Sequence, residues 1–422
     1  MGTPASNEGI GKAASMLLGM LRYDAGSAGA FAGFDARSPR WEEVLRLAER
    51  HGVAPLLLRA LETGGMLERC PESVRARLKE ARRVTALANL EKYGQFRAVA
   101  SALGEANVAV MALKGMHAAE LVYRDISLRP MSDVDILVPR EAVQRTIAAL
   151  RSIDYGYEAD VSGAGPRMLG TKCNIGLAHR RLGVWLEVHW SLAEPQDCYA
   201  PPMDEIWASA VRTRLGDADA RVMAPEFLLL HVCAHLACNH AFGFSLRGLC
   251  DVAEIVRAHP ALDWNQVVDS GRRHGWTRGV AAALRLARDR LGAAVPEGVL
   301  ASLGGDALDP ALLAEALKHM VGFYELPGEL TTAPNLLAIA GGGTFGEKVT
   351  ALWKRILVPR AELALLYGVP ERSARIYFCY ALRIRDLFRT YAGSAWALLV
   401  SDPKLGQAAA RHARLAKWIG GG

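Results

Sequence analysis

The spacing of apolar residues changes twice along this 422-residue chain, and the changes separate helical parts from a part that carries strands. Apolar residues recur every three or four positions over residues 41–107, which is the period of an amphipathic helix. Residues 108–113 instead form a short continuous apolar run, which is typical of a buried strand. The helical period returns after Pro225 and continues to residue 417. A strand-bearing unit is therefore predicted between two helical units.

The strand-bearing unit is predicted to alternate strands with helices and to end in a hairpin. Gly115 ends the first strand, and a helix is predicted to follow over residues 116–123. Pro139 suits the first turn of a second helix over residues 139–152. The strands are expected at residues 108–113, 134–138, 173–178 and 184–190. This order predicts an α+β chain whose minimal α/β core, with a small mixed sheet, lies between helical units.

Four parts of the chain follow from these changes of pattern. Residues 1–38 are rich in Gly, Ala and Ser and are predicted to form a flexible N-terminal arm, with one short helix around residues 16–21. The remaining boundaries give an N-terminal helical unit over residues 39–107, the α/β core over 108–192 and a helical C-terminal unit over 193–422.

The composition indicates a cytoplasmic globular protein. A hydrophobic content of 51% excludes a disordered chain, and a formal charge of +6 is mild for this length. The seven cysteines form an odd set without a C-x-x-C pair, so neither a disulfide framework nor a zinc ribbon is indicated. Residues 1–15 lack the pattern of a signal peptide, and the uncharged stretch 227–246 carries three histidines. We therefore expect neither secretion nor a membrane span.

Two aspartates stand two positions apart on a predicted strand, in the sequence Ser-Asp-Val-Asp-Ile. On a strand Asp133 and Asp135 point to the same face, where their carboxylates repel each other unless a cation lies between them. Glu187 lies between apolar neighbours on a later strand of the same unit. Magnesium prefers such oxygen ligands together with substrate phosphates. Three carboxylates can hold two metal ions, an arrangement used in phosphoryl and nucleotidyl transfer.

Four residues near the Asp pair are candidates for binding phosphate. Lys114 and Gly115 stand where a strand passes into a helix, so that phosphate can approach exposed backbone N–H groups next to a lysine charge. Arg129 and Ser132 come just before the Asp pair and offer a guanidinium and a hydroxyl at the same end of the strand. The residues together indicate a site for a nucleoside triphosphate.

These motifs resemble the three-part signature of the DNA polymerase β-like nucleotidyltransferase superfamily. More narrowly, Ala-Leu-Lys-Gly at 112–115, Leu-Arg-Pro-Met-Ser-Asp-Val-Asp at 128–135 and Leu-Glu-Val-His-Trp at 186–190 resemble the family of uncharacterised nucleotidyltransferases. The helical stretches 41–58 and 225–256 are similar to that family as well. One departure is Met116, which stands where the superfamily usually has Gly or Ser after the motif glycine.

The resemblance implies a magnesium-dependent enzyme that transfers a nucleoside monophosphate from an NTP, with ATP favoured, and releases pyrophosphate. Asp133, Asp135 and Glu187 would be the ligands of two Mg²⁺ ions, with Mn²⁺ as the alternative, and Gly115 would lie at the phosphates. The acceptor would be a small molecule, a peptide or a protein. The alternatives are a phosphotransferase, a toxin-type enzyme acting on RNA 3′ ends and an inactive nucleotide-binding protein; the charge of +6 disfavours RNA.

Further polar residues are candidates for supporting contacts or for the acceptor site. His189 shares the face of Glu187 and is either a general base or a hydrogen-bonding neighbour of the site. His231 and His235 lie one helical turn apart, a spacing that suits zinc, but helix packing near the site is favoured because no third ligand is specified. Arg247 and Asp251 are expected either to form an i,i+4 ion pair or to contact the nucleotide.

A run of arginines and aromatic residues over 360–389 allows two interpretations. It could form a basic and aromatic surface for RNA, but helical spacing favours an amphipathic helix with its aromatics in a core and its arginines in solvent.

Overall fold

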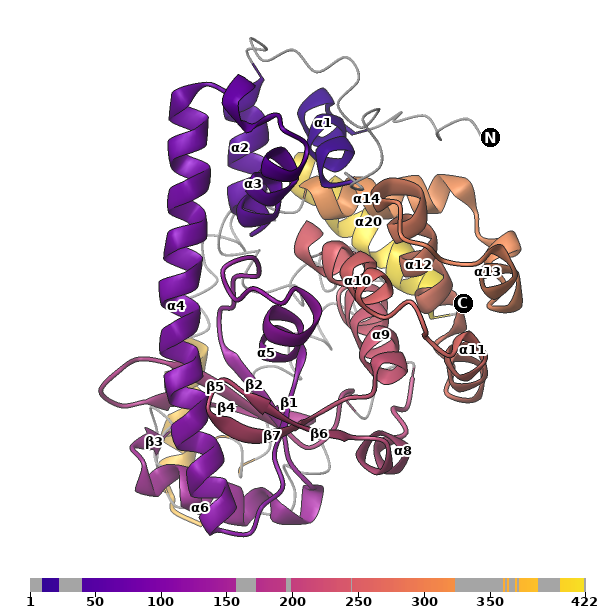
Figure 1. The fold of residues 1–422 in the computed structure, drawn as a ribbon. Helices are drawn as coiled ribbons and strands as arrows, with labels where there is room; N and C mark the ends of the chain where they lie inside the picture. The colour runs from indigo at the N-terminus through magenta and orange to yellow at the C-terminus, as the bar shows by residue number, and fades with distance from the viewer. Residues whose placement is uncertain are drawn as a thin grey trace.

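The fold is built on one sheet whose strands come from several stretches of the chain. The computed structural model describes residues 10–22, 40–156, 172–194, 199–243, 245–322, 372–385 and 403–420, and the single residues 360, 363 and 369. Within these residues a seven-stranded mixed sheet lies at one end of the molecule, and helices from before and after it in the chain pack together at the other end (Figure 1). The predicted α+β class is confirmed.

The strands lie in the order β3-β4-β5-β2-β1-β7-β6. Their bounds are β1 Met111–Ala112, β2 Val134–Leu137, β3 Tyr155–Gly156, β4 Asn174–His179, β5 Trp185–His189, β6 Val211–Leu215 and β7 Ala218–Val222. β2 pairs in parallel with β5, and β1 with β7, while the other neighbours are antiparallel. The parallel pair β2 and β5 is the centre of the site described below.

The four predicted strands are present, although the first is shorter than expected. Only two residues of the predicted strand 108–113 form β1, but single backbone hydrogen bonds extend the pairing, from Leu113 N to Asp135 O and from Arg221 N to Val110 O, both at 3.0 Å. The following helix begins earlier than predicted, as α5 (Lys114–His117), and continues as the π-helical turn η3 (Ala118–Val122).

The hairpin of β6 and β7 extends the sheet beyond the predicted end of the core at residue 192. Its pairs Thr213↔Ala220 and Leu215↔Ala218 place small and apolar side chains toward the helix α4 (Glu72–Glu105). The sequence of β6, Val-Arg-Thr-Arg-Leu, carries too many charges to stand out as a buried strand. This part of the predicted C-terminal helical unit therefore belongs to the sheet.

One face of the sheet is covered by α4 and α6 (Val143–Ser152), which lie side by side in Figure 1. Ile136 and Val188 point to this face and form a core with Phe96, Val99 and Leu103 of α4. Because side chains alternate along a strand, Asp135 and Glu187 point to the opposite face. The helix α4 thus packs against the sheet as well as against the N-terminal helices α2 and α3.

The other helices form one large core from both ends of the chain. Their bounds are α1 Lys12–Leu21, α2 Trp41–Arg50, α3 Ala54–Thr63, α8 Met203–Ala208, α9 Pro225–Ala234, the π-helical η5 His235–Asn239, α10 Leu246–Ala258, α11 Trp264–Arg273, α12 Thr277–Leu291, α13 Glu297–Ser302, α14 Pro310–Gly322 and α20 Pro403–Ile419, with the short 3₁₀ turns η2 Leu67–Arg69, η4 Arg140–Ala142 and η6 Gly305–Ala307. Leu57 of α3, Phe227 of α9 and Val280 of α12 are all buried in this core.

The predicted short helix near the N-terminus is present as α1, but it is not part of a loose arm. Leu17 and Leu18 are buried against the helical core, because the apolar face of α1 packs on α2, α3 and α12. Residues 1–9 and 23–38 of the predicted arm lie outside the described residues.

In the uncharged stretch 227–246, residues 227–239 belong to α9 and η5 and Leu246 begins α10, with the apolar side chains of α9 buried. None of the described helices combines the length and the hydropathy of a membrane span.

The basic and aromatic run near the C-terminus is described only in part. Tyr377 and Phe378 are 61% and 66% exposed, so the prediction that most of these aromatics lie in a core is wrong for this pair. Tyr377 instead accepts a hydrogen bond from Arg360 Nη2 at 2.6 Å, and the guanidinium lies over its ring. Tyr367 and Phe388 lie outside the described residues.

Candidate active site

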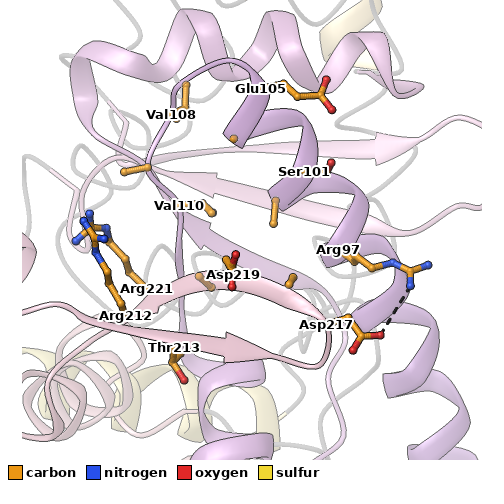
Figure 2. Close-up of a pocket in the computed structure, with 15 residues that line it drawn as sticks. Arg97, Ser101, Glu105, Val108, Val110, Arg212, Thr213, Asp217, Asp219 and Arg221 are labelled. Atoms are coloured by element: carbon orange, nitrogen blue, oxygen red, sulfur yellow. Dashed lines mark ion pairs between the residues drawn. The ribbon is translucent and has the colours of Figure 1, made fainter.

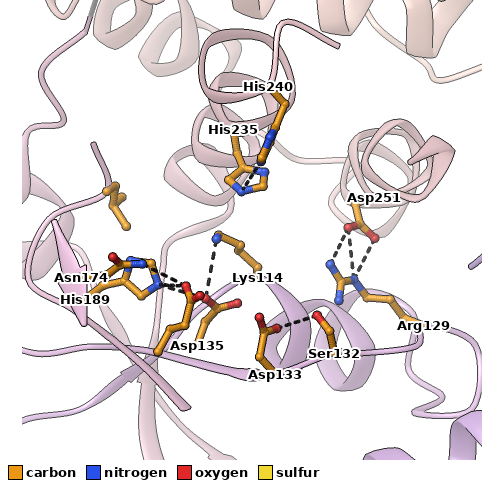
Figure 3. Close-up of polar contacts among 12 residues, drawn as sticks. Lys114, Arg129, Ser132, Asp133, Asp135, Asn174, His189, His235, His240 and Asp251 are labelled. Carbon is orange, nitrogen blue, oxygen red and sulfur yellow. Dashed lines mark hydrogen bonds and ion pairs between the residues drawn. The ribbon is translucent and has the colours of Figure 1, made fainter. Parts of the chain in front are cut away.

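The parallel pairing of β2 and β5 brings the predicted carboxylates together. Asp135 is the direct cross-strand partner of Glu187, so both side chains leave the sheet side by side on the face opposite α4. Asp133 precedes Asp135 by two residues and faces the same space (Figure 3). The three carboxylates therefore lie on one face of the sheet, as their positions in the sequence predict.

The three carboxylates open into a cleft of about 800 Å³ between the sheet and the helices α9 and α10. The lining residues are Lys114, Gly115, Arg129, Met131, Ser132, Asp133, Asp135, Trp185, Glu187, Val232, His235, Leu236, His240, Arg247, Gly248 and Asp251. Every predicted site residue except His189 and His231 is among them. Residues far apart in the sequence thus share one cleft.

A second hollow of about 760 Å³ lies between α4 and the β6–β7 hairpin. Figure 2 shows Arg212 and Arg221 next to each other on the paired strands, and Arg97 reaching toward Asp217, 3.9 Å away. This hollow contains none of the predicted site residues. We therefore place the candidate active site in the first cleft.

His189 lies beneath the carboxylates and joins two of them. Its Nε2 is 3.0 Å from Asp135 Oδ1 and 3.3 Å from Glu187 Oε2. Burial alone would lower the pKa of His189, but hydrogen bonds to Asp135, Cys173 and Glu187 raise it to about 10. The imidazole is therefore protonated and donates to the carboxylates, which favours the supporting role over that of a general base.

Burial and neighbouring charges shift the pKa values of the two aspartates in opposite directions. Burial raises the pKa of Asp133, and the negative charges of Asp135 and Glu187 raise it further. Burial also acts to raise the pKa of Asp135, but Lys114 and His189 outweigh it and hold the pKa below its ordinary value. Lys114 Nζ lies 3.7 Å from Asp135 Oδ1. The positive groups Lys114 and His189 thus lie next to the carboxylates and partly balance their charge.

The donor atoms suit a hard divalent cation. The carboxylates of Asp135 and Glu187 each offer an oxygen within 4.8 Å of the other and of a ring nitrogen of His189. Carboxylate oxygens are the ligands that Mg²⁺ prefers, and Asp133 opens into the same cleft. His189 supports these two carboxylates from below, and Asp133, the third predicted ligand, faces the same cleft.

Gly115 permits close packing of α5 against the loop before β2. A Cβ at this position would lie 2.9 Å from Met131 Sδ and 3.1 Å from Arg129 Nη1, closer than Cβ atoms normally approach. Lys114, just before it, has a positive φ of 26°, a strained conformation for a residue with a side chain. The glycine is thus required by the fold as well as being positioned at the cleft.

Arg129 is held mainly by an aspartate and not left free for phosphate. Its Nε and Nη2 donate to Asp251 at 3.0 and 2.8 Å, and both side chains are buried. Tyr123 Oη donates to the same carboxylate at 2.9 Å. Asp251 therefore binds Arg129, which lies on the loop before β2. Arg247 donates to Pro130 O of the same loop at 2.9 Å.

Asn89 of α4 fixes the loop that carries Arg129 and Ser132. Its Nδ2 donates to Ile126 O at 2.6 Å and to Arg129 O at 2.8 Å, and its Oδ1 accepts from Met131 N at 3.3 Å. The side chain is fully buried. One amide thus satisfies three backbone groups of a loop that has no regular secondary structure.

Replacing Asn89 with Ala is expected to lower the free energy of unfolding by about 2–3 kcal/mol, because three backbone groups lose a buried partner. Urea denaturation measures the change. Glu91→Ala, an exposed position on the same helix, is the matched control and is expected to change stability by less than about 0.5 kcal/mol. Equal effects of the two variants would contradict the role given to Asn89.

The histidines of α9 and η5 form the opposite wall of the cleft. His235 Nε2 lies 3.3 Å from His240 Nε2, and both rings face the carboxylates across Lys114 (Figure 3). His231 is buried behind them, and burial lowers its pKa to about 3. Within the described parts of the chain the group of three potential metal ligands is the one at Glu187, so packing next to the site is favoured over zinc at His231 and His235.

Some cleft residues were not found from the sequence. His240 lies beside His235 because the π-helical turn between them brings residues five apart onto one face, and no regular α-helical spacing predicts this. Asn174 Nδ2 donates to Glu187 Oε2 at 3.0 Å from the neighbouring strand β4. Only the register of the hairpin, which the sequence leaves open, shows that contact.

A comparison with family models connects this geometry to an activity. The model of the family described as uncharacterised nucleotidyltransferases matches residues 37–292, which is more than half of the chain and includes every residue of the cleft. The chain belongs to this family. The predicted membership of the family of uncharacterised nucleotidyltransferases is thereby confirmed.

This nucleotidyltransferase is therefore an enzyme of the nucleotidyl-transferring type. A search of curated proteins found no match to it. The match ends at residue 292, just after α12, so the family accounts for the sheet and for the helices around the cleft but not for α13, α14 and α20.

Proposed function

We propose that this nucleotidyltransferase transfers a nucleoside monophosphate from a magnesium-bound NTP to a hydroxyl group of a small molecule, a peptide or a protein. The observation that carries the proposal is the register of β2 and β5, which sets Asp135 beside Glu187 in a cleft that also contains Lys114 and Gly115. Carboxylates and a lysine in one cleft are the groups that a metal-bound triphosphate requires.

Asp133, Asp135 and Glu187 would hold Mg²⁺, two ions in our proposal, with Mn²⁺ as the alternative. When bound, the metal neutralises phosphate charge and activates the attacking hydroxyl. Carboxylates that hold the metal ions in this way are typical of the DNA polymerase β-like superfamily, to which we propose to assign the core.

The basic groups of the cleft would bind the triphosphate. Lys114 balances Asp135 in this structure, and its flexible amine can turn to a phosphate within the same cleft. Ser132 is exposed at the cleft mouth, where its hydroxyl donates to Asp133 at 3.0 Å. Arg129 offers its Nη1 beside Gly115 while Asp251 holds the rest of the guanidinium. Lys114 would thus supply most of the mobile positive charge.

The transfer itself is an in-line displacement at the α-phosphorus. The acceptor oxygen forms the new P–O bond, its proton passes to a carboxylate of the cleft, and the bond to the β-phosphate oxygen breaks so that pyrophosphate leaves. The protonated His189 is not available as the base, but it keeps Asp135 and Glu187 in register for the reaction.

The products distinguish this reaction from phosphoryl transfer on the same groups. ATP labelled at the α- or the γ-phosphate, incubated with the enzyme, Mg²⁺ and candidate acceptors, is expected to give labelled pyrophosphate from the γ-label and a labelled acceptor from the α-label. Accumulation of ADP with γ-label on the acceptor would contradict nucleotidyl transfer and support a kinase-type reaction.

A further inference from the structure

Trp185 is unusually exposed for a tryptophan in a sheet. It begins β5 and is 44% exposed, whereas Leu186 and Val188 of the same strand are fully buried. Trp41, Trp190 and Trp276 are exposed by 3% or less. An aromatic side chain of this size is usually buried or engaged with a partner. Trp185 opens instead into the cleft that contains the carboxylates.

A glycine on the next strand fixes the place of the indole. A Cβ on Gly176 of β4 would lie 2.4 Å from Trp185 Cζ2 and 3.2 Å from its Nε1, so the ring lies directly over the glycine backbone. Any other residue at position 176 would displace it. Since the backbone supports the ring from one side, the indole is held in place before any ligand binds.

The register of the strands places the ring next to the reacting groups. Val134 pairs with Leu186, so Trp185 stands level with Asp133 on the neighbouring strand. Glu187 follows two residues later and points to the same face. The indole is thus at the edge of the carboxylate cluster, within the same cleft.

We propose that Trp185 stacks against the base of the donor nucleotide, and that the enzyme therefore binds purine NTPs more tightly than pyrimidine NTPs. The inference rests on the proposed function. The α-phosphate must reach the carboxylates, the base is joined to it through the ribose, and the indole lines the same cleft as the carboxylates. A stacking ring discriminates by area more than by hydrogen bonds, so the larger purine gains more.

Calorimetric titration of ATP, CTP and inorganic tripolyphosphate in the presence of Mg²⁺ tests the inference on the full chain. Trp185→Ala is expected to weaken ATP binding about tenfold or more and to reduce the preference for ATP over CTP, because one stacked base is worth about 1–3 kcal/mol. Trp185→Phe keeps a ring and is expected to stay within about threefold of the wild type. Tripolyphosphate has no base, so its affinity is expected to be the same in all variants.

Leu182→Ala is the matched control, since Leu182 is an exposed apolar residue in the turn of the same hairpin and lies outside the cleft lining. An unchanged ATP affinity in Trp185→Ala, or an equal loss for ATP and tripolyphosphate, would overturn the stacking role. If the wild type bound neither ATP nor tripolyphosphate, the proposed function itself would be refuted, and that result is distinct from a failure of stacking alone.

Discussion

The Asp135→Asn variant is expected to lose nucleotidyl transfer by at least about 1000-fold while its fold is retained. The amide occupies the same space and can still accept from His189, but it removes one negative charge from the group that would bind the metal. The initial rate of pyrophosphate release with a working acceptor measures the loss of transfer. The melting temperature of the same variant shows whether the fold is retained.

Asp219→Asn is the matched control for this variant. Asp219 lies on β7 of the same sheet, is exposed and does not line the cleft. Its replacement is expected to leave the rate within about twofold of the wild type, as for surface changes away from a site. Full activity of Asp135→Asn would remove Asp135 from the mechanism and with it the assignment of the carboxylate group.

Asp251→Ala is expected to lower the free energy of unfolding by about 3–5 kcal/mol, because it leaves the guanidinium of Arg129 buried without its counter-charge. Tyr123 loses its acceptor at the same time. This pair joins α10 to the loop before β2, so the loss is expected to loosen the cleft as well as the fold. Chemical denaturation measures the stability change.

Two comparisons separate the ion pair from a general effect of mutation. Asp306→Ala, at an exposed position, is expected to change stability by less than about 0.5 kcal/mol. The double variant Arg129→Met with Asp251→Leu replaces the whole pair by apolar groups and is expected to recover much of the loss. A loss below about 1 kcal/mol in Asp251→Ala would show that the pair is not needed for the fold.

The central pair of strands could be predicted because its residues carry two signals at once. Val134 and Ile136 mark a buried strand, and the aspartates that alternate with them indicate that the other face is a site. Glu187 between Leu186 and Val188 gives the same double signal. The register that sets Asp135 beside Glu187 then follows from parallel pairing, which only the structure shows.

Long-range partners could not be predicted from local patterns. The sequence suggests that Asp251 pairs with Arg247 one helical turn away, yet Asp251 binds Arg129, more than a hundred positions earlier. Asn89 holds the same loop from a helix that the sequence places in another unit. Such contacts depend on how α4 and α10 pack on the core, and helical periodicity carries no information about it.

The packing of the helices into one core could not be predicted for a related reason. The sequences of α1, α3 and α12 have the pattern of ordinary amphipathic helices. The spacing of their apolar residues does not indicate that the three helices pack into a single core. The β6–β7 hairpin, whose short strands carry Arg212, Arg214 and Arg221, lies at the edge of the sheet and was not predicted. In each case the tertiary partner, and not the local sequence, determines the structure.

The most direct test of the account is the melting temperature of the wild type and of the Asp133→Asn/Asp135→Asn variant with ATP, in the presence and absence of Mg²⁺. We expect the melting temperature of the wild type to rise only when both ATP and Mg²⁺ are present, and we expect no rise for the double variant. An equal rise in the double variant, or no rise in the wild type with ATP, GTP, CTP or UTP, would contradict the claim that these carboxylates form a metal-dependent nucleotide site.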